Sequence, residues 1–206
     1  MKIRQIAAAA AATLALAGAA TAQDTTGSVA TLKVGEPAPA FALKDASGKE
    51  HKLADYKGKV VVLEWTNPQC PFVVKHYKNG DMQALAKKYQ DKGVVWLAVN
   101  SSHFNTPEDS QNIAKEWKIE HPVLQDPDGK VGKAYGARTT PHMFVIDKDG
   151  NLAYQGAIDS DSSRDPEAVK GATNYVAAAV DALLEGKPVE NPATKPYGCS
   201  VKYKAN

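Results

Sequence analysis

The sequence predicts an α/β protein in which helices cover both faces of a mixed central β-sheet. Two apolar runs rich in β-branched residues, 60–65 and 94–99, are each followed by apolar residues at helical spacing. Continuous apolar runs are typical of strands buried on both faces, and their alternation with helices favours a layered architecture. A pair of later strand candidates, 142–147 and 151–156, flanks the turn 147–151 and predicts a hairpin that closes the sheet.

The first 22 residues have the pattern of a secretory signal peptide. Lys2 and Arg4 precede an apolar run over 6–20, and Ala-Thr-Ala at 20–22 matches the A-x-A cleavage pattern. We expect cleavage after Ala22 and export, and the alanine-rich run favours a bacterial periplasm. A membrane anchor is the alternative, but the run is short for a bilayer span. Residues 23–33 are polar and small, and we expect a flexible leader.

The remaining 184 residues (206 less 22) are enough for one domain with a full core, expected over 34–186 and followed by a tail over 187–206. Without Lys2 and Arg4 the chain has 23 basic and 23 acidic residues and no long basic run. Nucleic acid and anionic membranes are therefore not expected partners.

The other elements follow from turn residues and spacing. Residues 41–43 and 50–53 flank the turn 45–49 and predict a β-hairpin. Two helical segments are expected on either side of a break at 79–81, the second ending near Gly93. The further candidates are a helix over 107–118 with Thr106 as its N-cap, a short strand over 121–125, a short helix over 130–135, a helix over 174–184 and a loop-like tail.

Cys70 has the position of a reactive thiol. It follows the first buried strand and a polar turn, and it directly precedes Pro71, which suits the first position of a helix. The unpaired N–H groups and the positive end of the helix dipole stabilise a thiolate at such an N-cap. Lys75 and His76 would add to this effect if their side chains turn back. The alternative is a buried structural cysteine.

Three segments resemble the thioredoxin-like superfamily and, within it, the redoxin branch, which is AhpC/TSA or peroxiredoxin-like. They are Val-Gly-Glu-Pro-Ala-Pro-Ala-Phe at 34–41, Trp-Thr-Asn-Pro-Gln-Cys-Pro at 65–71 and Gly-Ala-Arg-Thr-Thr-Pro-His at 136–142. The resemblance implies a thioredoxin-like three-layer sandwich with an N-terminal β-hairpin. It also implies that Pro141 is cis beside the thiol and that the Thr140 backbone is offered to an extended substrate.

The active turn departs from two family patterns. Thioredoxins carry C-x-x-C, and here Asn67 stands at the first cysteine, so dithiol exchange within the motif is excluded. Peroxiredoxins carry P-x-x-x-T-x-x-C, and here Leu63 and Asn67 stand at the Pro and Thr positions. The resemblance assigns a hydrogen-bonding role near the thiol to Asn67 or Thr66, and the role of the peroxide-polarising arginine to Arg138.

The second cysteine, Cys199, follows a glycine in the tail. This segment resembles the C-terminus of a periplasmic redoxin subgroup that pairs a Cys-Pro-Phe-Val turn with a distal Gly-Cys. The resemblance implies that the Cys70 thiolate attacks a peroxide, becomes a sulfenic acid and condenses with Cys199 as resolving thiol. A permanent disulfide that ties the tail to the domain is the alternative.

Together these observations predict an exported thiol oxidoreductase that reduces peroxides through Cys70 and Cys199. The alternatives are thiol-disulfide exchange with periplasmic proteins, and a binding module with a structural disulfide. A peroxide or protein disulfide and an external thiol reductant are the expected partners, and the oligomeric state stays open. No cofactor or metal is expected, because the histidines lack paired metal spacing. His142 is expected nearest the thiol, and Glu64 is either a solvated strand-end residue or a proton relay.

Overall fold

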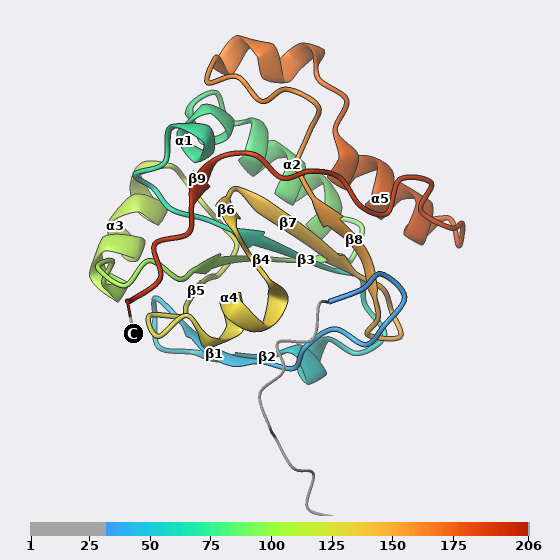
Figure 1. Ribbon diagram of the computed structural model, residues 1–206, viewed down its shortest axis with the longest axis horizontal. Coiled ribbons are helices and arrows are strands. Elements are labelled where there is room, and N and C mark those ends of the chain that lie inside the picture. The colour runs from blue at the N-terminus through green and yellow to red at the C-terminus, as the bar shows by residue number, and fades with distance from the viewer. Residues whose placement is uncertain (1–31, 206) are drawn as a thin grey trace, which may run out of the picture.

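The computed structural model describes residues 32–205, which form a central mixed sheet with helices packed on it (Figure 1). The expected signal peptide and all of the expected leader before Leu32 lie outside the described residues. The strands are β1 (Ala42–Asp45), β2 (Glu50–Lys52), β3 (Val61–Trp65), β4 (Val95–Asn100), β5 (Val123–Gln125), β6 (Thr139–Thr140), β7 (His142–Ile146), β8 (Leu152–Gly156) and β9 (Cys199–Ser200). The helices are α1 (Pro71–Lys78), α2 (Asp81–Gln90), α3 (Pro107–Glu116), α4 (Lys130–Tyr135) and α5 (Tyr175–Leu184), with short 3-10 helices η1 (Leu53–Tyr56) and η2 (Pro166–Gly171).

The main sheet has seven strands in the order β2-β1-β5-β4-β3-β7-β8. Strands β3, β4 and β5 are parallel neighbours, whereas β7, β8 and the β1–β2 hairpin pair antiparallel. The expected mixed sheet and N-terminal hairpin are confirmed. Strand β3 lies inside the sheet, and its last residue, Trp65, pairs with Val99 on one side and His142 on the other.

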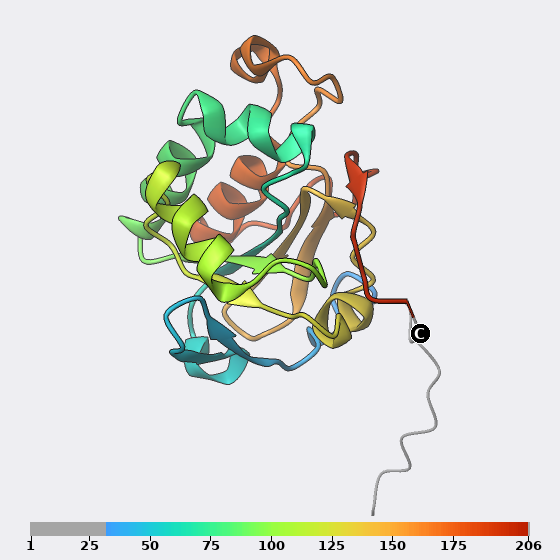
Figure 2. The same ribbon diagram turned by 90° about the vertical axis from the view of Figure 1, so that its left-hand side faces the viewer.

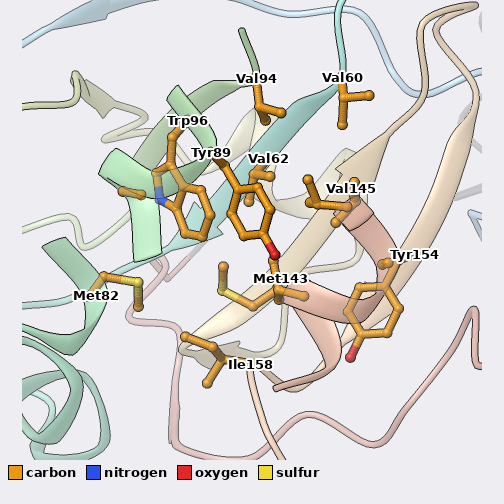
Figure 3. Close-up of a cluster of buried hydrophobic side chains, with 14 of the residues drawn as sticks. Val60, Val62, Met82, Tyr89, Val94, Trp96, Met143, Val145, Tyr154 and Ile158 are labelled. Carbon is orange, nitrogen blue, oxygen red and sulfur yellow. The ribbon is translucent and has the colours of Figure 1, made fainter. Parts of the chain in front are cut away.

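Alternation along β3 divides the core into two layers, because successive side chains of a strand point to opposite faces. Val60 and Val62 pack in a cluster with residues of α1, α2 and α5. Figure 3 shows part of this cluster, with Trp96, Tyr89 and Met143 gathered beside the sheet. The opposite face holds the second cluster, which includes Val61, Leu63, Trp65, Phe41 of the N-terminal segment and Tyr135 of α4. Both faces of the strand are therefore buried, as its apolar run predicts.

Three local features differ from expectation. Helix α3 ends at Glu116 instead of Lys118, because Trp117 is the C-cap and Lys118 has a left-handed φ of 54°. The 3-10 helix η2 was not expected from the sequence. The tail is not only loop, because Cys199 and Ser200 form β9, which pairs with β6 in a small second sheet. Within residues 32–205, the structure contains no helix with the length and apolarity needed to cross a membrane.

Candidate active site

The turn after β3 delivers Cys70 to the start of α1. The Asn67 carbonyl accepts the Cys70 N–H at 3.0 Å, and the Asn67 side-chain oxygen accepts the Gln69 N–H at 3.0 Å. Cys70 is the N-cap, and Pro71 begins the helix, as predicted. Since the Cys70 residue is only 1% exposed, the thiol is covered by neighbouring segments.

One covering segment is the loop between α4 and β7. The Thr140–Pro141 peptide bond is cis, as the family resemblance implies. The Cys70 thiol donates to the Thr140 carbonyl over 2.9 Å between sulfur and oxygen. This contact places the proline segment directly beside the thiol.

The second covering segment is the C-terminal tail. Strand β9 pairs antiparallel with β6, with Cys199 opposite Thr140 and Ser200 opposite Thr139, and the Val201 N–H donates to the Arg138 carbonyl at 3.0 Å. Figures 1 and 2 show the tail running past β6 beside the first turn of α1. The backbone edge that the resemblance assigns to an extended substrate is thus occupied by the chain's own tail.

Gly198 makes this approach possible. Its φ is 134°, and a Cβ at this position would lie 2.1 Å from the Thr140 carbonyl oxygen. A side chain is therefore excluded by both backbone conformation and space. The Gly-Cys pair noted in the sequence has a direct structural reason, since the glycine lets Cys199 reach the thiol-bearing turn.

The two thiols differ in acidity. Burial alone raises the pKa of Cys70. Hydrogen bonding from the Cys199 thiol and from the N–H groups of Cys199 and Val73 outweighs burial, so the pKa lies below its usual 9.0. Burial, and then hydrogen bonding to Cys70 and its negative charge, raise the pKa of Cys199 to about 11. Cys70 is therefore the more acidic thiol of the pair, and Cys199 is the less acidic one.

Several residues expected at the thiol have their hydrogen bonds elsewhere. Thr66 is buried and its N–H donates to the Val99 carbonyl at 2.9 Å, whereas the Asn67 side chain is used by the turn itself. Arg138 is exposed, and within residues 32–205 no hydrogen bond or ion pair joins its guanidinium to Cys70. His142 is buried on β7, where its Nδ1 accepts the Arg138 N–H at 3.2 Å.

The side chains of Lys75 and His76 do not turn back to the thiol. The Lys75 ammonium donates to the Asp161 carbonyl at 2.6 Å, and His76 Nε2 lies 3.1 Å from the Tyr197 hydroxyl. Both residues are 1% exposed. No pattern in the sequence indicates this burial, because both are charged or polar residues in an amphipathic helix.

Glu64 is fully buried in β3, so the expectation of a solvated strand-end residue is wrong. Its Oε2 accepts a hydrogen bond from the Tyr77 hydroxyl at 2.9 Å and a longer one from Trp96 at 3.5 Å. Burial raises its pKa to about 7, against the hydrogen bonds from Tyr77, Trp96 and Thr66. A carboxyl with this pKa exchanges protons near neutral pH, close to the helix that carries Cys70.

Three residues near the thiols were not singled out from the sequence: Asp159, Tyr197 and Tyr203. Tyr197 and Tyr203 lie on either side of Cys199, and the Tyr203 hydroxyl donates to the Ala137 carbonyl at 2.8 Å. Two aromatic residues so close to the tail cysteine are the signal in the sequence that could have indicated an anchored tail. Within residues 32–205, no three His, Cys, Asp or Glu side chains gather into a group suited to a metal ion.

Comparisons with known proteins agree with this geometry. The model of the AhpC/TSA family matches residues 34–155. The thiol-disulfide oxidoreductase ResA of Bacillus thuringiensis subsp. konkukian is 34% identical over 121 residues, which cover 59% of this chain and 68% of the relative. A hypothetical protein from Sinorhizobium meliloti 1021 superposes with a TM-score of 0.74 at 29% identity, over 85% of this chain and 97% of that one.

A lower-identity structure shows the fold more widely. The thioredoxin domain of a thiol-disulfide oxidoreductase from Bacteroides vulgatus superposes with a TM-score of 0.54 at 22% identity, over 68% of this chain and 97% of that one. The architecture is thus thioredoxin-like. The family match spans the hairpin, the Cys70 turn and the cis-proline segment, and the chain belongs to the AhpC/TSA family.

Proposed function

We propose that this protein is a thiol-disulfide oxidoreductase in which Cys70 is the nucleophile and Cys199 the second thiol. The observation that carries the proposal is the pairing of β9 with β6, which sets Cys199 opposite Thr140, the residue whose carbonyl accepts the hydrogen bond of the Cys70 thiol. The similarity to ResA, a thiol-disulfide oxidoreductase, supports disulfide exchange over other thiol chemistry. From the signal-peptide pattern of residues 1–22 we also propose that it acts in the periplasm.

The proposed reaction has two exchange steps. The Cys70 thiolate attacks one sulfur of a substrate disulfide, which forms a mixed disulfide and releases the other substrate sulfur as a thiolate. Cys199 then loses its proton to that thiolate or to solvent and attacks the Cys70 sulfur, which releases the remaining substrate thiolate. The substrate gains two electrons and the protein becomes a Cys70–Cys199 disulfide. An external dithiol closes the cycle by reducing this disulfide.

Peroxide reduction, the reaction that the sequence favours, has weaker support. It needs donors that hold the peroxide at the sulfur, and Thr66, Asn67 and Arg138 were the residues expected to provide them. Thr66 is instead buried, the Asn67 side chain holds the turn, and the Arg138 side chain is exposed. The groups around the Cys70 sulfur are instead the Thr140 carbonyl, which accepts from the thiol, and Cys199 of the tail.

Trapping of the substrate distinguishes the alternatives. In a Cys199→Ser variant the second step is blocked, so incubation with a disulfide-bonded protein such as insulin should accumulate a mixed disulfide at Cys70. The control variant Cys70→Ser should trap nothing. If the Cys199→Ser variant forms no mixed disulfide but gains a sulfenic acid with dilute peroxide, peroxide reduction is correct. If neither adduct forms, the two cysteines have a structural role.

A further inference from the structure

A buried polar cluster lies between α1, the loop after β8 and the tail. Its charged and polar members are Lys75, His76 and Asp159, which are 1%, 1% and 2% exposed. Tyr197, two residues before Cys199, reaches into this cluster. Buried ionisable groups are costly unless they are paired, so the contacts among these side chains define what the cluster does.

The Tyr197 hydroxyl is the central group of the hydrogen bonds in this cluster. The Tyr197 hydroxyl donates to Asp159 Oδ1 at 2.5 Å, and it can therefore accept from the His76 Nε2–H, whose nitrogen lies 3.1 Å away. The Lys75 ammonium lies 4.9 Å from the centre of the Tyr197 ring and pairs with Asp161. The other Asp159 oxygen, Oδ2, has no hydrogen-bond partner within the described residues and lies 4.0 Å from His76 Nδ1. Among the side chains of residues 32–205, Tyr197 is therefore the donor to the Asp159 carboxylate.

The cluster joins the elements that carry the two thiols. His76 belongs to the helix that begins directly after Cys70, and Tyr197 precedes Cys199 by two residues. Gly198, between Tyr197 and Cys199 in the chain, lies against the Thr140 carbonyl. This close contact fixes the path of the backbone from Tyr197 to Cys199. A rotation or release of Tyr197 would therefore move Cys199 relative to the Cys70 sulfur.

We propose that Tyr197 is a positioning residue that keeps Cys199 at the Cys70 sulfur, with Asp159 and His76 holding its hydroxyl. This inference rests on the proposed disulfide exchange and concerns its second step. A thiol in the same chain reacts at a high effective concentration. Each contact that restricts its motion near the reacting sulfur raises that effective concentration. Tyr197 touches neither reacting sulfur, so its effect is on the rate at which Cys199 attacks the mixed disulfide.

The test uses the full chain reduced and mixed with one equivalent of the aromatic disulfide dithionitrobenzoate (DTNB). Attack by Cys70 releases the first coloured thionitrobenzoate, and attack by Cys199 on the resulting adduct releases the second. In Tyr197→Phe the first release should be as fast as in the wild type or faster, because the tail that covers Cys70 is loosened. The second release should slow about tenfold, the effect of losing one hydrogen bond to a charged group.

Tyr89→Phe is the matched control, because the Tyr89 hydroxyl also donates to a carboxylate, Asp181, at 2.9 Å on the α2–α5 side of the molecule. It loses a bond of the same kind and should keep both release rates. Asp159→Asn retains an oxygen acceptor without the charge, so it should slow the second release by a smaller factor, roughly threefold.

The outcomes separate the two proposals. If the wild type releases one thionitrobenzoate and keeps the adduct, disulfide exchange between the two cysteines is wrong. If the wild type releases both and folded Tyr197→Phe releases the second at the wild-type rate, the positioning role of Tyr197 is wrong. Equal slowing of the second release in Tyr89→Phe would also overturn it, since general loss of stability would then account for the effect.

Discussion

Cys70 and Cys199 have the same side chain but different acidity, because each sets the other's environment. Burial raises the pKa of Cys70, but hydrogen bonding from the Cys199 thiol and N–H outweighs it, so the pKa lies below 9.0. Burial, and then the hydrogen bond and negative charge of Cys70, raise the pKa of Cys199 to about 11. The proposed mechanism uses this asymmetry, with Cys70 as the attacking thiol and Cys199 protonated until the second step.

This mutual effect predicts how single variants titrate. Cys199→Ala removes a donor from the Cys70 sulfur and should raise the Cys70 pKa. Cys70→Ala removes the negative charge and the hydrogen-bond partner, so the Cys199 pKa should fall from about 11 toward 9.0. Ultraviolet absorbance of the thiolate against pH measures both values. If each cysteine titrates at the same pH with and without the other, the two sulfurs are not in contact in solution.

Glu64 predicts a pH dependence of stability that is independent of the thiols. Burial raises its pKa from 4.5 to about 7 in the folded protein. The folded state therefore holds a proton that the unfolded state releases, and the contribution to stability is fully present below pH 4.5 and lost as pH rises through 7. From that shift we expect a loss of roughly 3 kcal/mol over this window.

Glu64→Gln isolates this contribution, because the amide keeps an oxygen acceptor for Tyr77 but does not titrate. The free energy of unfolding, measured by denaturant titration, should decline less between pH 4.5 and 7 in this variant than in the wild type. If the free energy of unfolding depends on pH in the same way in both proteins, Glu64 does not have a raised pKa in the folded state.

At the scale of elements, the tail strand β9 covers the backbone edge beside the Cys70 thiol. It occupies the free edge of β6 next to Thr140, so a protein substrate that binds there as a strand has to displace it.

Local signals in the sequence predicted the regular elements well. The β-branched runs predicted β3 and β4, and Thr106 with Pro107 predicted the start of α3. They could not predict β9, since a two-residue strand has no periodicity and its partner is far away in the sequence.

Gly198 tests whether that strand pairing matters. Gly198→Ala places a Cβ against the Thr140 carbonyl, so β9 should leave β6. We expect Cys70 to become more reactive toward a bulky maleimide and the Cys70–Cys199 disulfide to form more slowly, each on the order of tenfold. Gly171→Ala is the control, because nothing lies within 4 Å of a Cβ there and its φ is not left-handed. Identical behaviour of the two variants would rule out a role for β9.

At the scale of the whole molecule, the fold brings together three segments that are distant in the chain. The Cys70 turn, the Thr140–Pro141 segment and Cys199 each had a signal in the sequence, and the family resemblance related all three. The burial of Lys75 and His76 had no such signal, because the residues that cover them, Asp161 and Tyr197, come from later segments. Long-range contacts of this kind depend on how the layers pack, and no local pattern records them.

The central claim is that thiols from two ends of the domain act as one redox pair within a single chain. Peptide mapping by mass spectrometry, after oxidation of the reduced protein with one equivalent of a small disulfide, tests it most directly. We predict one cross-link, Cys70–Cys199, in a species with the mass of a single chain, and its complete reversal by a dithiol. Two separately modified cysteines, or a cross-link between two chains, would contradict it.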